Sequence, residues 1–158
     1  MGNERRVAVS TPKAPSPRFS YSQGIIAQGL LFIAGQVPID PETGSVAETF
    51  ADQVHQTLKN LAAVAEAAGG SLADAVRVSV YLEDLDRVQE MDAIYRGYFA
   101  VPLPARTTIR AGLRGFMVEM DAVVALEGQG PEPPSGSPEQ VDRLAAPGTS
   151  SALDKWEL

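Results

Sequence analysis

The chain has 158 residues, of which 44% are hydrophobic and 21% charged, as in one soluble globular domain with tails. Its formal net charge of -7 argues against nucleic-acid binding, because neutralising phosphates requires clustered Lys and Arg. The absence of cysteine excludes disulfides, thiolate catalysis and Cys-ligated metals. No apolar run approaches the roughly 18 to 20 residues of a membrane span. We therefore expect a cytoplasmic protein with neither a nucleic-acid nor a membrane partner.

The first part of the chain predicts short strands. Residues 1–18 form an irregular, proline-rich lead-in with one short strand at Arg6 to Ser10. Two apolar runs, 25–27 and 30–34, are separated by Gln28-Gly29, which predicts two strands joined by a tight turn. A loop rich in turn-forming residues follows.

The clearest helix comes next. Ser45 and Glu48 match a capping box, and apolar residues recur at helical spacing from Phe50 to Ala68. Gly69-Gly70 predicts the end of this helix, because glycine accepts the left-handed conformation common there. The only histidine, His55, lies off the apolar stripe without metal-ligand neighbours. We therefore expect a surface histidine and no metal site.

The next part alternates between strand and helix. Residues 75–82 predict a strand with Val76, Val78 and Val80 on one face. A second helix is predicted from Asp84 or Asp86 to about Phe99, before two prolines.

Two final strands, at about 106–111 and 116–126, complete the order strand, strand, strand, helix, strand, helix, strand, strand. This order predicts an α+β domain over residues 19–127, with a mixed sheet and two helices packed on one face.

Two charged residues in the last two predicted strands are candidates for a function. Arg106 begins one strand, and Glu119 lies within the apolar run of the other. A buried charge normally has a partner or a task, because burial alone costs several kcal/mol. Arginine can grip a carboxylate through two parallel hydrogen bonds, and glutamate can orient water and accept its proton. The pair could hydrolyse a small acidic substrate, with Glu119 ionised beside the arginine. The alternatives are structural or intersubunit ion pairs, and for Asp121 pairing across an interface is favoured.

The composition changes at Gly128. Residues 128–158 are rich in Pro, Gly and Ser and predict a flexible C-terminal tail. The tail contains the only tryptophan, Trp156. It is either solvated or docks on a partner through a short peptide.

Four segments, in order and nearly at family spacing, resemble the RidA (YjgF) family of reactive-intermediate deaminases. They are Tyr21-Ser22-Gln23-Gly24; the run from Phe32 to Gly44; Val80 to Leu85 with Met91 to Tyr95 and Tyr98-Phe99; and Pro104-Ala105-Arg106-Thr107 with Val118 to Ala122. The resemblance implies a chorismate-mutase-like fold and a homotrimer with sites in the clefts between subunits. It also implies hydrolysis of small 2-imino acids or their enamines, such as 2-iminobutanoate and 2-aminoacrylate, to 2-keto acids and ammonia. No metal or organic cofactor is implied.

The resemblance also assigns roles to individual residues. The arginine that grips the substrate carboxylate is Arg106, and the acid that positions water is Glu119. The pocket would be lined by Tyr21, by Ala34 and Gly35, and by the backbone amide of Thr108.

This chain departs from the family pattern at several positions. Ala34 stands where serine is usual, Asp92 where asparagine is common, and Thr108 where cysteine is frequent. The link between Arg106 and Glu119 is also about two residues shorter than is common. These departures leave open a biosynthetic relative with a larger imine or amide-like substrate. A non-enzymatic module that binds a metabolite or a protein is the other alternative.

Overall fold

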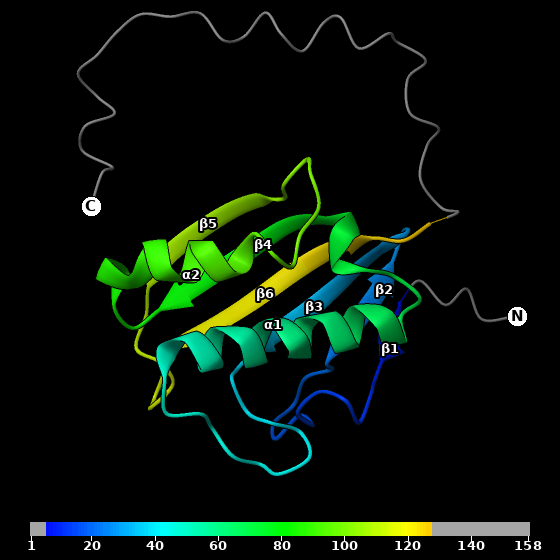
Figure 1. Cartoon of the computed structure of the whole chain (residues 1–158). Helices are drawn as coiled ribbons and strands as arrows, with labels where there is room; N and C mark the ends of the chain where they lie inside the picture. Colours follow the sequence, from blue (N-terminus) through cyan, green and yellow to red (C-terminus); the bar gives the residue numbers. More distant parts are fainter. Residues whose placement is uncertain (1–5, 128–158) are drawn as a thin grey trace, which may run out of the picture.

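The computed structural model describes residues 6–127, and these form a six-stranded mixed sheet with two α-helices (Figure 1). The strands are β1 (Val7–Val9), β2 (Gly24–Ala27), β3 (Leu30–Gln36), β4 (Ala75–Leu82), β5 (Ala105–Arg110) and β6 (Val118–Ala125), in the spatial order β1-β2-β3-β6-β4-β5. The helices are α1 (Phe50–Ala67) and α2 (Val88–Tyr95). Only β4 and β5 pair in parallel; the other neighbours are antiparallel. The predicted α+β class and element order are confirmed.

Both helices cover the same face of the sheet (Figure 1). The strands alternate, so one side chain in two points at the helices. In β6, for example, Val118, Met120, Ala122 and Val124 are buried, whereas the residues between them are half-buried. The opposite face carries no helix within residues 6–127, and Phe32 is 46% and Ile109 48% exposed on it. One face of the sheet therefore makes the core, and the other is available for contacts.

The start of α1 differs from the prediction. The N-cap is Thr49, whose hydroxyl accepts the backbone N–H of Asp52 at 3.2 Å and donates to its carboxylate at 2.6 Å. Ser45 lies in the loop four residues before Thr49, and its hydroxyl oxygen is 2.7 Å from that of Thr43. The predicted Ser45–Glu48 capping box is therefore wrong, because a second cap-forming residue lies four positions further on. The helix ends before Gly69, at φ +78°, as predicted.

The predicted orientation of Val76 in β4 needs correction. Val76 is 46% exposed rather than on the face of Val78 and Val80, because the pairing of β4 with β6 shifts register between Ala75 and Arg77.

The second helix is also shorter than predicted. A 3-10 turn (Leu85–Arg87, capped by Asp84) precedes α2, and α2 ends at Tyr95. The chain then continues in turns to the buried Phe99, so burial extends beyond the helix.

Buried amides hold the loops in place. Gln23 accepts the N–H of Thr11 at 2.6 Å and donates to three carbonyls of the segment that precedes it. Asn60 of α1 donates to the carbonyls of Val37 and Ile39, each at 2.9 Å. Gln53 joins two other loops, by donating to the carbonyl of Ala47 at 2.8 Å and accepting the N–H of Met117 at 2.9 Å. Each amide satisfies backbone groups of buried or half-buried loop residues.

The predicted tail at 128–158, with Trp156, lies outside the described residues. Among residues 6–127, neither helix has the length and hydropathy that crossing a membrane requires. The division into a lead-in at 1–18 and a domain at 19–127 stays a prediction, although β1 of the lead-in pairs with β2.

Candidate functional site

Arg106 lines a pocket of about 650 Å³. The pocket is formed by α2, by the chain that follows it and by the start of β5. Its lining combines charged and apolar side chains: Asp92, Tyr95, Arg96, Phe99, Val101, Leu103, Pro104 and Arg106. A cationic group beside an apolar wall suits an organic anion.

The side chain of Arg106 has two contacts on α2. Its Nη1 donates to Oδ1 of Asp92 at 2.7 Å, and its guanidinium lies 4.7 Å from the centroid of the Tyr95 ring. Both partners of the ion pair are about one quarter exposed. Asp92 also accepts a hydrogen bond from Arg96, and the two arginines together lower its pKa, Arg96 first. A structural ion pair, considered above as an alternative for Arg106, is therefore present in the single chain.

Glu119 lies against a bulge in β3. Ile33 pairs with Ala122 and Gln36 with Met120, so Ala34 and Gly35 form an irregularity opposite Asp121. A Cβ at position 35 would lie 2.2 Å from Oε1 of Glu119. Only glycine leaves room for the carboxylate there, because real Cβ atoms do not approach an oxygen so closely.

The environment of Glu119 makes its carboxyl group a stronger base. Burial raises its pKa, and the negative charge of Asp121 on the same face raises it further. Asp121 itself accepts a hydrogen bond of 2.9 Å from the hydroxyl of Tyr81, which raises the pKa of that phenol. A carboxyl group with a raised pKa suits proton transfer near neutral pH.

The structure does not bring Arg106 and Glu119 together in one chain. Arg106 is in register with Val78, which is buried under the helices, whereas Glu119 is in register with Tyr81 on the opposite face. The sheet therefore separates the two groups. The expected proximity of Arg106 to an ionised Glu119 does not hold within one chain, because the two positions differ in strand parity. A site that uses both groups would have to take Arg106 from one chain and Glu119 from another.

The other predicted residues divide between the half of the site with Arg106 and the half with Glu119. Thr108 shares the face of Arg106, since it pairs with Val80. Ala34 adjoins Gly35, and its N–H donates to the carbonyl of Gln23 at 2.9 Å. Tyr21 is about half exposed, in the loop before β2.

Sequence reasoning missed the two ion pairs of Asp92, one with Arg96 and one with Arg106. The available signal was the i, i+4 spacing of Asp92 and Arg96 on a predicted helix, which places the two side chains together.

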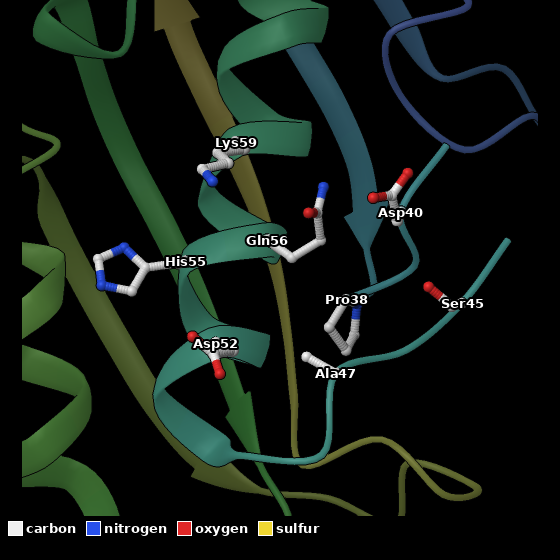
Figure 2. A pocket seen from close by; sticks show the side chains of 8 residues that line it. All are labelled: Pro38, Asp40, Ser45, Ala47, Asp52, His55, Gln56 and Lys59. Atoms are coloured by element: carbon white, nitrogen blue, oxygen red, sulfur yellow. The ribbon is translucent and has the colours of Figure 1, made fainter. Parts of the chain in front are cut away.

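A second pocket, of about 490 Å³, lies between the outer side of α1 and the loop that precedes it (Figure 2). Its polar groups already serve the local structure. Asp40 accepts the N–H groups of Glu42 and Thr43, and Asp52 is bound by the cap of α1. His55 is exposed, as predicted, with its Nδ1 2.8 Å from the hydroxyl of Tyr98. Residues 6–127 contain no group of three or more acidic or histidine side chains that could hold a metal.

The comparisons with known proteins agree with one another. The family model described as endoribonuclease L-PSP matches residues 11–126. A RutC family protein from Pyrococcus horikoshii is 40% identical over 122 residues, which cover 75% of this chain and 97% of that protein. A 2-iminobutanoate/2-iminopropanoate deaminase from Salmonella typhimurium is 32% identical, covering 73% and 94%. The crystal structure of RidA from Psychrobacter sp. PAMC 21119 matches with a TM-score of 0.73 at 34% identity, covering 76% and 99%.

Proposed function

We propose that this chain, which belongs to the endoribonuclease L-PSP family that includes the RidA (YjgF) and RutC proteins, hydrolyses small 2-imino acids and their enamines to 2-keto acids and ammonia. The observation that carries the proposal is the pocket lined by Arg106 together with apolar side chains. A relative named as a 2-iminobutanoate/2-iminopropanoate deaminase supports the substrate class.

The chemistry needs little more than placement. Arg106 binds the carboxylate of the imino acid and fixes which face of the C=N bond meets water. Glu119 accepts a proton as the water oxygen bonds to the imine carbon, and it returns this proton to the nitrogen, which gives a carbinolamine. Glu119 then carries the proton of the new hydroxyl group to the nitrogen. The C–N bond breaks as the C=O bond of the 2-keto acid forms, and ammonia leaves. The raised pKa of Glu119 supports this exchange of protons.

The proposal includes a homotrimer in which each site draws on two copies. Arg106 and Thr108 come from one copy, and Glu119 and Gly35 from the next. The exposed apolar residues on the helix-free face support such contacts, since exposed apolar patches mark interaction surfaces. Tyr21, Ala34 and the Thr108 amide keep their proposed pocket roles. The proposed compartment is the cytoplasm, which the cysteine-free sequence allows.

The test is the turnover of freshly generated 2-iminobutanoate, followed as ammonia released above the uncatalysed rate. Arg106→Ala should lower kcat/KM by about 100-fold or more, because the substrate loses its charge-assisted anchor. Arg110→Ala is the matched control, since Arg110 lies on the same strand and donates instead to the carbonyl of Glu83. Light scattering should show that both variants assemble like the parent. A parent protein no faster than uncatalysed hydrolysis would overturn the proposal.

A larger imino acid is the second candidate. The Arg106 pocket, at about 650 Å³, lies within the range of about 300 to 1,000 Å³ typical of sites for drug-sized ligands. Val101 and Leu103 are exposed in its wall and could contact an apolar substituent. Comparing kcat/KM for 2-iminobutanoate and for the imine of phenylalanine discriminates the two candidates.

A further inference from the structure

Arg106 shares its carboxylate partner with a second arginine. Oδ1 of Asp92 accepts from Arg106 at 2.7 Å, and Oδ2 accepts from Arg96 at 2.5 Å. Each carboxylate oxygen therefore serves one guanidinium. All three side chains line the same pocket. Arg96 is the most exposed of them, at 69%, and stands four residues after Asp92 on α2.

The charges of these three residues decide whether an anion can bind. If Asp92 faced Arg106 alone, their charges would cancel, and a substrate carboxylate would meet an anion beside its binding group. With Arg96 present, two guanidinium cations and one carboxylate leave a net charge of +1 at the pocket. This local charge matters because the whole chain carries -7 and repels anions at long range.

We propose that Arg96 is a positioning residue of the Arg106 site, which neutralises Asp92 so that Asp92 can orient Arg106 without cancelling its attraction for a substrate carboxylate. This inference rests on the proposed function, because it assumes that Arg106 receives a carboxylate. Asp92 and Arg96 then act as a unit. Removing Arg96 alone should weaken binding, and removing both charges should restore it, which is the non-additivity expected of residues in one network.

The experiment uses the full-length protein and two readouts. One is the affinity for 2-oxobutanoate, measured by calorimetry, and the other is the steady-state kinetics with freshly generated 2-iminobutanoate. Arg96→Gln should weaken the affinity and raise KM by about three- to tenfold, because a positive charge close to the bound anion is lost. The kcat should change by less than about twofold, because Arg96 has no part in proton transfer. Adding Asp92→Asn to Arg96→Gln restores the net charge of +1 and should return both constants to within about twofold of the parent.

A matched control removes the same charge elsewhere. Arg87 pairs with Glu90 at 2.7 Å, three residues apart and outside the Arg106 pocket, so Arg87→Gln should leave affinity and KM unchanged. An Arg96→Gln variant with parental affinity would overturn the inference, and so would a double variant as weak as Arg96→Gln. In either case a parent protein that binds 2-oxobutanoate and accelerates hydrolysis leaves the proposed function standing. A parent that does neither overturns the proposed function and this inference with it.

Discussion

At the scale of single residues, two positions tie backbone geometry to chemistry. Gly35 gives Glu119 the space that any Cβ would occupy, and the bulge around Gly35 shapes that space. The Arg106 guanidinium lies over the ring of Tyr95, and burial raises the pKa of the Tyr95 hydroxyl to about 12, so this phenol stays neutral. Both residues act through the charged group they touch.

Gly35→Ala should therefore impair catalysis far more than stability. The new methyl group displaces the Glu119 carboxylate, which is the free end of a flexible side chain and can move without unfolding the strand. We expect kcat for 2-iminobutanoate to fall by about tenfold or more, because small misplacements of a catalytic group are costly.

Gly112→Ala is the control for this substitution. A Cβ at position 112 meets nothing within 4 Å, and the residue lies in a loop. Its kcat and thermal midpoint should match those of the parent. Equal kcat values for the two alanine variants would contradict the role of Gly35.

At the scale of elements, the beginning of α1 depends on one threonine. Thr49→Ala removes both hydrogen bonds with Asp52 and should lower the free energy of unfolding by about 1 kcal/mol. Ser45→Ala should change it by less than about 0.5 kcal/mol, because Ser45 is exposed and caps no helix. Urea unfolding at one fixed protein concentration measures both changes. A larger loss for the serine variant would contradict the cap assignment.

The elements also show how far the sequence could be read. The order and type of the elements followed from periodicity and turn residues. The charged residues Arg106 and Glu119 in the last two strands indicated the candidate site. The helix cap was misjudged because two cap-forming residues lie four positions apart, and local pattern does not choose between them. The outward turn of Val76 depends on a shift in pairing with β6, and no pattern within β4 encodes that shift.

The separation of Arg106 from Glu119 on opposite faces of the sheet could not be predicted for a related reason. It depends on the register of β5 and β6 against β4, and register is a property of strand pairs. The partner of Arg106 was missed because Asp92 was seen only as a departure from a family pattern.

At the scale of the whole molecule, the proposed assembly depends on the exposed face of the sheet. Phe32 packs among half-buried neighbours on this face, opposite Val123 in the register of β3 and β6. A charge placed there would be buried by a second copy without a partner, at a cost of several kcal/mol.

Phe32→Asp should therefore convert the assembled protein to monomers and abolish turnover of 2-iminobutanoate, while the far-ultraviolet spectrum stays that of a folded chain. Sedimentation velocity at micromolar concentration measures the first effect. Leu85→Asp introduces the same charge at a comparably exposed apolar residue beside the helices, and should leave the assembly intact. A Phe32→Asp protein that sediments like the parent would contradict the proposed interface.

The fastening of the loops by Gln23, Gln53 and Asn60 has a practical consequence. Carboxamides neither gain nor lose protons across the usual laboratory range, and their neutral bonds are little weakened by dissolved ions. Acidification or high salt should thus weaken the ion pairs of Asp92 with Arg96 and Arg106 before it loosens the framework around them. The amide hydrogen bonds of the framework are therefore less sensitive to pH and salt than the ion pairs of the pocket.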